Sequence, residues 1–209
     1  MKIVFMGTPE FSVPILKMLI KNYNVVGVVT QPDREVGRKK VLTPSPIKQT
    51  AMEFNIPVIT PEKLRIEYEN VLAFKPDIIV TCAYGQILPN EILNYPKYGC
   101  INVHASLLPK YRGGAPIQRA IMNGEVKTGI TIMYMNEGMD TGDMIEKKEL
   151  IIENDDNYDE VSKKLSVIGT DLLEDVLPKV IKGKIKRTIQ DNEEATYAPI
   201  IKREDEKLD

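Results

Sequence analysis

The stretch Asp77-Ile-Ile-Val-Thr-Cys82 decides the fold class, because it is an almost unbroken apolar and β-branched run. Strands that are buried on both faces have this composition, and they occur in parallel sheets that helices cover on both sides. On either side of this run the chain alternates short β-branched segments with helical patterns. This order predicts an α/β protein with a Rossmann-like, mostly parallel twisted sheet, helices on both faces and right-handed crossover connections.

The elements that flank the run follow from hydrophobic periodicity and from helix-start signals. Further strands are expected over residues 2–6, 25–30, 57–59, 100–103, 128–135, 144–152 and 184–189. Helices are expected after the N-cap residues Ser12 and Ser45, each with a proline in its first turn, and over residues 62–74 and 157–181. Residues 31–44 are expected to form a long polar loop, and residues 202–209 have no core-forming pattern.

A second stretch, Gly99-Cys-Ile-Asn-Val-His-Ala-Ser-Leu-Leu-Pro-Lys-Tyr-Arg-Gly-Gly-Ala-Pro116, contains the only histidine of the chain, His104. Asn102 precedes it by two positions, so both side chains are expected on one face of a strand. A lone histidine at a strand end is often a satisfied polar residue, but the loop that follows favours a site. That loop has a stiffening proline, paired glycines and two leucines, Leu107 and Leu108, that are expected to be exposed.

Histidine is the side chain whose ordinary pKa lies nearest neutral pH, so it is the usual proton carrier in catalysis. In open parallel sheets ligands bind at the carboxyl ends of the strands. His104 and the pair Tyr84-Gly85 both follow predicted strands, so we expect them to border one cleft.

Length and composition exclude several classes of protein. The 209 residues, 43% hydrophobic and 28% charged, suit one globular domain with a small appendage. No signal peptide or membrane span is expected, and Cys82 and Cys100 are expected as buried reduced thiols of a cytoplasmic protein. No His/Cys cluster predicts a metal site, and neither a dinucleotide fingerprint nor a Walker A sequence occurs.

The net charge of −2 hides a local excess of basic residues between Gln31 and Lys48. Five cations lie there against two carboxylates: Arg34, Arg38, Lys39, Lys40 and Lys48 against Asp33 and Glu35. Such a run is either a solvated surface loop or a surface that attracts phosphates.

Together these motifs give the chain a resemblance to a known family. It resembles the N-terminal catalytic domain of the methionyl-tRNA formyltransferases, within the larger family of 10-formyltetrahydrofolate-dependent formyltransferases. The resemblance runs from Met1 to about Asp209. It rests on six segments in order, residues 5–9, 30–34, 42–48, 83–85, the His104 stretch and Gly138-Met-Asp-Thr-Gly-Asp143.

The resemblance implies a reaction and a set of catalytic residues. A formyl group would pass from 10-formyltetrahydrofolate, a co-substrate, to the α-amine of methionyl-tRNA for translation initiation, without a metal. Asn102 and His104 would donate hydrogen bonds to the oxyanion, each worth about 3 kcal/mol. Asp140 would orient His104 and help to move the proton.

The resemblance also implies the binding residues. Folate would contact Ser106, Leu107, Leu108, Pro109, Tyr84, Gly85, Ile87 and Leu88. The acceptor end of the tRNA would contact the basic loop through Arg34, Arg38, Lys39 and Lys40. Ordinary core packing is the alternative for the leucines, and solvation is the alternative for the loop.

The resemblance further divides the chain into a catalytic domain over residues 1–189 and a charged linker over residues 190–209. The linker would lead to a C-terminal domain that this chain lacks. A monomer is expected. Two other functions stay open: a formyltransferase of the same family acting on a small amine, such as glycinamide ribonucleotide or an amino sugar, and a non-catalytic RNA-binding module.

Overall fold

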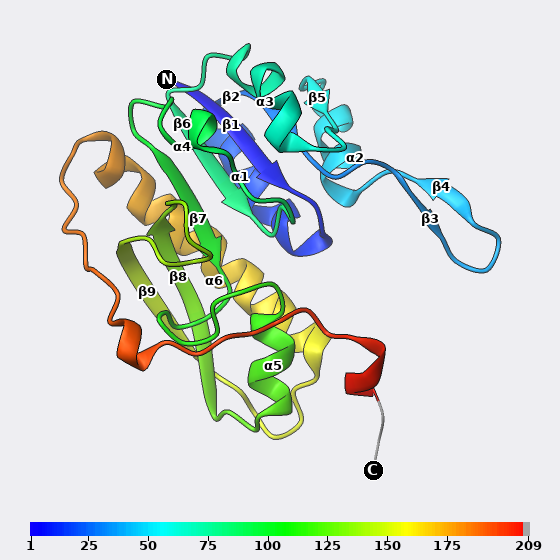
Figure 1. Ribbon diagram of the computed structural model, residues 1–209, viewed down its shortest axis with the longest axis vertical. Helices are drawn as coiled ribbons and strands as arrows, with labels where there is room; N and C mark the ends of the chain where they lie inside the picture. The colour runs from blue at the N-terminus through cyan, green and yellow to red at the C-terminus, as the bar shows by residue number, and fades with distance from the viewer. Residues whose placement is uncertain (207–209) are drawn as a thin grey trace.

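The computed structural model describes residues 1–206, which fold around one seven-stranded sheet (Figure 1). Its strand order is β5-β2-β1-β6-β7-β8-β9. The strands are β1 (Lys2–Gly7), β2 (Asn24–Val29), β5 (Val58–Ile59), β6 (Ile78–Cys82), β7 (Cys100–His104), β8 (Lys127–Tyr134) and β9 (Met144–Ile151). The first five are parallel, whereas β8 and β9 are antiparallel to their neighbours. The predicted α/β class with a mostly parallel sheet is confirmed.

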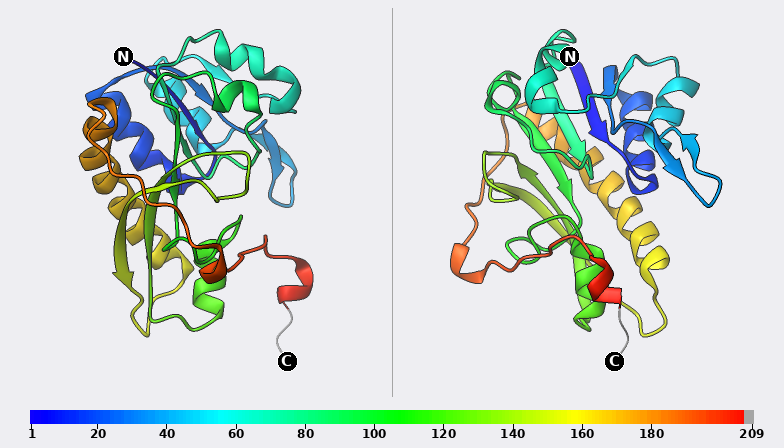
Figure 2. Two further views of the ribbon diagram at one scale, coloured as in Figure 1. Left: turned by 60° about the vertical axis from the view of Figure 1, so that its left-hand side comes forward. Right: turned by 45° about the vertical axis from the view of Figure 1, so that its right-hand side comes forward.

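Helices cover both faces of this sheet (Figure 2). They are α1 (Val13–Asn22), α2 (Pro46–Glu53), α3 (Leu64–Leu72), α4 (Asn90–Leu93), α5 (Pro116–Met122) and α6 (Tyr158–Ile181). The alternation of side chains along β1 divides the core: Ile3 and Phe5 pack in the cluster that contains α1 and α6, while Val4 and Met6 pack with α3 and α4. Within residues 1–206 no helix is long and apolar enough to cross a membrane.

The structure confirms one of the two predicted helix N-caps and contradicts the other. Ser45 accepts a hydrogen bond from the backbone N–H of Lys48, so it caps α2 as predicted. Ser12 precedes α1, but the prediction that its side chain caps the helix is wrong. A 3₁₀ turn over Glu10–Ser12 leads into α1, and the Ser12 hydroxyl instead donates to the carbonyl of Cys82 at 2.7 Å. It thereby ties α1 to the end of the buried strand β6.

The loop predicted over residues 31–44 is instead a β-hairpin, with β3 (Arg34–Val36) paired to β4 (Val41–Thr43). Both strands are largely exposed, so they lack the alternation of apolar and polar residues that identifies a half-buried strand. The helices α4 and α5 were not predicted, because four and seven residues give too little periodicity.

The strand predicted over residues 184–189 is wrong. This segment makes a single bridge, between Thr188 and Met144 at the start of β9. Most of its side chains are exposed, and Arg187 stacks over the Tyr134 ring at 3.8 Å instead of extending the sheet. From here the chain passes beside β9 and reaches α5, as the orange-to-red segment in Figure 1 shows.

Candidate active site

His104 is the last residue of β7, and its side chain is only 6% exposed. Its Nε2 lies 2.9 Å from the carbonyl oxygen of Tyr111. A carbonyl can only accept a hydrogen bond, so Nε2 carries a proton and donates it. Nδ1 is therefore the ring nitrogen left for chemistry, and it lies 3.7 Å from Oδ1 of Asp140.

Asn102 lies two residues earlier on the same face of β7, as predicted. The hydroxyl of Thr81, on the neighbouring strand β6, donates to the amide oxygen of Asn102 at 2.8 Å. With its oxygen held in this way, Asn102 presents its NH₂ group as a hydrogen-bond donor. The buried sheet thus orients the asparagine amide.

Asp140 lies in the turn between β8 and β9, with a backbone φ of +52° that non-glycine residues rarely adopt. One carboxylate oxygen, Oδ1, faces His104. The other, Oδ2, accepts a hydrogen bond from the backbone N–H of Gly113 at 2.8 Å. β8 runs antiparallel to β7 and ends beside Ile101, near the start of β7, so the turn after β8 folds back along β7 to bring Asp140 to His104.

Hydrogen bonds from Thr131 on β8 hold the loop that follows His104. Thr131 donates its hydroxyl proton to the Ser106 carbonyl at 2.7 Å and accepts from the Leu108 N–H at 3.1 Å. Leu108 is fully buried against Met133 and Met144, so the prediction that it is exposed is wrong. Leu107 is half-buried. The loop can therefore offer a ligand its backbone, together with the Leu107 side chain.

The residues proposed for the opposite side of a folate site lie on the loop after β6. The Tyr84 ring is buried in the same core cluster as Leu64 and Leu88. Its hydroxyl is the one buried side-chain polar atom of residues 1–206 without a hydrogen-bond partner, and burial raises its pKa. Ile87, by contrast, is 77% exposed. Tyr84 can thus support the loop from inside, while Ile87 can touch a ligand.

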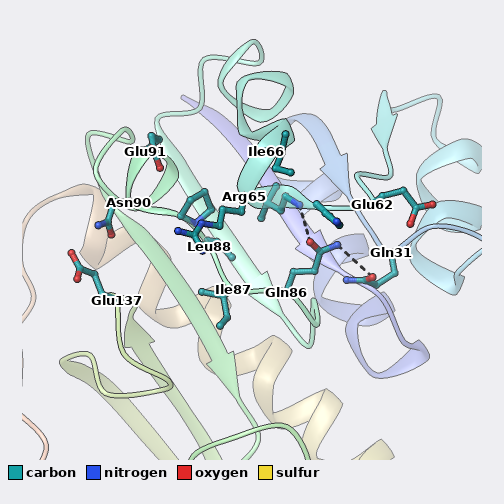
Figure 3. A pocket seen from close by; sticks show the side chains of 13 residues that line it. Gln31, Glu62, Arg65, Ile66, Gln86, Ile87, Leu88, Asn90, Glu91 and Glu137 are labelled. Atoms are coloured by element: carbon teal, nitrogen blue, oxygen red, sulfur yellow. Dashed lines mark hydrogen bonds between the residues drawn. The ribbon is translucent and has the colours of Figure 1, made fainter.

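A hollow of about 790 Å³ adjoins this loop (Figure 3). Ile87, Leu88 and the start of α3 line it, whereas Asn102, His104 and Asp140 do not. Gln86 shapes its wall, because its side-chain oxygen accepts from the Leu64 N–H at 2.8 Å and its NH₂ donates to the Pro61 carbonyl at 3.0 Å. Asn102, His104 and Asp140 thus lie outside the lining of this hollow, which Glu137 of the Asp140 turn does reach.

The basic residues lie on the β3–β4 hairpin, which projects from the sheet (Figure 2). Arg34, Arg38, Lys39 and Lys40 are all exposed. Lys40 forms an exposed ion pair with Glu35 at 3.8 Å, and the less exposed ammonium group of Lys48 binds Asp33 at 2.8 Å. The hairpin tip thus presents cations to the solvent together with exposed Val36, Val41 and Leu42.

Sequence reasoning missed two buried polar residues near the site, Arg112 and Gln190. Arg112 directly follows Tyr111, and its Nε donates to the Gln190 side-chain oxygen at 3.0 Å. Gln190 in turn donates to the carbonyl of Asp140. No periodic pattern marks such residues, because their partners lie 50 to 78 positions away in the chain.

Neither cysteine has reactive surroundings. Cys82 and Cys100 are free and buried, and burial raises the pKa of each thiol to about 12. Within residues 1–206 no group of three or more His, Cys, Asp or Glu side chains could hold a metal ion.

Comparisons with known proteins agree on one family. A family model described as formyl transferase matches residues 1–177. The methionyl-tRNA formyltransferase of Bacillus subtilis is 63% identical over the whole chain, and that of Listeria monocytogenes is 57% identical. The chain spans 67% of the length of each.

Solved structures show the same fold at low sequence identity. An N-formyltransferase from Helicobacter canadensis, in complex with folinic acid and dTDP-3-aminofucose, has a TM-score of 0.74 at 24% identity, over 98% of this chain and 72% of that one. The methionyl-tRNA formyltransferase from Clostridium thermocellum has a TM-score of 0.64 at 22% identity, over 98% and 74%.

Proposed function

The chain belongs to the formyl transferase family, and we propose that it transfers the formyl group of 10-formyltetrahydrofolate to the α-amino group of methionyl-tRNA. The whole-length identity of 63% to a methionyl-tRNA formyltransferase supports this substrate. The main structural support for the proposed reaction is that Asn102, His104 and Asp140 lie close together at the carboxyl end of β7.

Each of these three side chains has a role that its contacts allow. Asn102 donates from its NH₂ group to the formyl oxygen, where negative charge develops as the amine attacks; such a donor contributes about 3 kcal/mol. His104 acts through Nδ1, because Tyr111 occupies Nε2. Nδ1, when it carries a proton, donates to the same oxygen. Asp140 orients the ring, and it takes up the proton that the attacking amine loses and passes it to N10 of the folate as the bond from N10 to the formyl carbon breaks.

Folate is proposed to bind between the loops 84–88 and 106–109 and to supply the formyl group there. The exposed side chain of Ile87, the half-buried Leu107 and the ring of Pro109 offer apolar walls, and the backbones of Gly85 and Ser106 offer polar groups, as a flat heteroaromatic ring requires. The Ser106 carbonyl also accepts from Thr131. Tyr84, Leu88 and Leu108 support these walls from the core.

The β3–β4 hairpin is proposed to contact the acceptor end of the tRNA. Its four exposed cations, Arg34, Arg38, Lys39 and Lys40, would neutralise phosphates and make binding depend on salt. We further propose a cytoplasmic monomer whose catalytic domain spans residues 1–189. The linker predicted from residue 190 begins with residues that contact the site.

The test of the reaction is formyl transfer from 10-formyltetrahydrofolate to methionyl-tRNA by the parent chain and by His104→Ala. We expect turnover by the parent and a loss of at least about 100-fold in the variant. Equal activity of the two chains would contradict the assignment of His104. Parent activity on glycinamide ribonucleotide or an amino sugar but not on the tRNA would contradict the substrate.

The hairpin is tested separately, with Arg38, Lys39 and Lys40 changed to alanine. The control changes Lys17, Lys21 and Lys182, which are exposed on α1 and just after α6. We expect the hairpin variant to lower the slope of log affinity against log salt by roughly two to three, and the control to leave it unchanged. Equal slopes in the three proteins would refute a phosphate-binding hairpin.

A further inference from the structure

The segment after α6 binds both loops of the active site. We call residues 188–198 the C-terminal strap (Figures 1 and 2). At its start, Thr188 and Met144 exchange two backbone hydrogen bonds, at 2.8 and 2.9 Å. At its end, the N–H of Arg112 donates to the Thr196 carbonyl at 2.9 Å, and the N–H of Ala198 donates to the Arg112 carbonyl at 2.7 Å. The strap therefore joins the loop that follows His104 to the strand that follows Asp140.

Gln190 is the point at which the strap meets the Asp140 turn. Its side chain is buried, and its Nε2 donates to the carbonyls of Asp140 and Gly142, each at 2.8 Å. These two carbonyls belong to Asp140, which adopts the left-handed conformation, and to the residue two positions after it. Such a conformation persists in a non-glycine residue only when its surroundings impose it. The two hydrogen bonds from Gln190 supply that constraint.

Arg112 fixes the orientation of the Gln190 amide. Its Nε donates to Oε1 of Gln190 at 3.0 Å, and one terminal nitrogen donates to the side-chain oxygen of Asn192 at 3.0 Å. A guanidinium can only donate, so the Gln190 oxygen must face Arg112 and its NH₂ must face the turn. Within residues 1–206 this buried guanidinium forms no ion pair, and its charge is directed to two amide oxygens.

We propose that Gln190 is a positioning residue for the formyl-transfer reaction, and that Arg112 sets the direction of its amide. Gln190 holds the Asp140 turn, and Asp140 in turn faces Nδ1 of His104. The backbone of the residue before Arg112 holds the other nitrogen of the same ring. One hydrogen-bonded chain thus fixes the imidazole and its carboxylate relative to each other. This proposal rests on the proposed function only for its catalytic readout.

Two variants separate the parts of the Gln190 amide. Gln190→Met keeps the length of the side chain and removes all three hydrogen bonds. Gln190→Glu keeps an oxygen for Arg112 but replaces the donor to Asp140 and Gly142 with an acceptor. The control is Val176→Ala, a core truncation on α6 in the main hydrophobic cluster, which lowers stability without touching the strap.

Two measurements are made on each protein at a temperature below its melting transition. The first is kcat and KM for 10-formyltetrahydrofolate. The second is the imidazole ¹⁵N spectrum, which reports on one ring alone because His104 is the only histidine. We expect both Gln190 variants to lower kcat about 10- to 100-fold, to change KM less than about twofold and to move the His104 ring signals. We expect Val176→Ala to change none of the three.

The two measurements distinguish failure of this proposal from failure of the proposed function. The spectrum needs no turnover. Moved His104 signals in both Gln190 variants would therefore support the positioning role of Gln190 even if the parent chain proved inactive on the tRNA. An active parent with unchanged kcat and unchanged signals in Gln190→Met would overturn the proposal. A loss of kcat equal to that of Val176→Ala would overturn it as well.

Discussion

Thr81→Val tests whether the sheet orients the Asn102 amide for the proposed reaction. The valine keeps the shape of the side chain on β6 and removes the hydroxyl that donates to Asn102 at 2.8 Å. One neutral hydrogen bond contributes about 0.5–1.5 kcal/mol, which corresponds to roughly a 2- to 10-fold change in rate if it is used to hold the amide in its reactive orientation. Removing the amide itself, in Asn102→Ala, should cost about 100- to 1000-fold. We therefore expect a moderate fall in kcat for formyl transfer from Thr81→Val.

The double variant makes this test specific. If Thr81 acts only through Asn102, then Thr81→Val should have no further effect on kcat in the Asn102→Ala background. Thr50→Val serves as the control, because its buried hydroxyl donates to the Pro46 carbonyl at 2.9 Å in α2, far from Asn102 along the chain. The shortest contact of the Thr81 hydroxyl is the one to Asn102; the Ile101 carbonyl oxygen and the Met135 sulfur lie at 3.3 and 3.2 Å. Both threonine variants should lose about 1 kcal/mol of stability. An unchanged kcat in Thr81→Val, or an equal fall in both backgrounds, would refute the reasoning.

Four further perturbations test other parts of the structure. Gly113→Ala should abolish most formyl transfer and lower the melting temperature, because φ is +123° and the new Cβ would lie 2.7 Å from the Ala198 carbonyl oxygen; a fully active, equally stable variant would contradict this. Cys82 and Cys100 should resist iodoacetamide at about pH 8 until the protein is unfolded, as mass spectrometry would show. Folding raises the pKa of both thiols from 9.0 to about 12. Their contribution to the free energy of unfolding should therefore be fully present below pH 9.0 and should be lost as the pH rises toward about 12. A free energy of unfolding that stays constant over this range would be inconsistent with buried thiols. Asn157→Ala should lower the free energy of unfolding in urea by about 1 kcal/mol, because a capping box begins α6 there, and kcat should not change.

Local rules predicted those parts of the site that depend on one strand. The alternation of side chains is enough to place Asn102 beside His104, and the almost unbroken apolar run over residues 77–82 is enough to place the neighbouring strand in the buried interior. Asp140 could not be placed by such a rule. β8 ends near the start of β7, so the approach of Asp140 to His104 depends on how the turn after β8 folds back along β7, and the family resemblance supplied it instead.

The errors have physical causes of the same kind. Leu108 has the surroundings of an exposed loop residue in the sequence, but Met133 and Met144 bury it from a distant hairpin. Residues 184–189 have the composition of a strand, yet their backbone pairs with the sheet only at Thr188. Gln190 carries no local signal, because its three partners are brought together by the fold.

The C-terminal strap also bears on the order in which the protein becomes active during synthesis. All seven strands and the helix α6 that covers them are complete by residue 181, whereas the strap begins seven residues later. A nascent chain can therefore bury its sheet on the ribosome before the Asp140 turn has its partners. We expect folding of the core and maturation of the catalytic centre to be separate events in time, the second awaiting release of the strap from the exit tunnel.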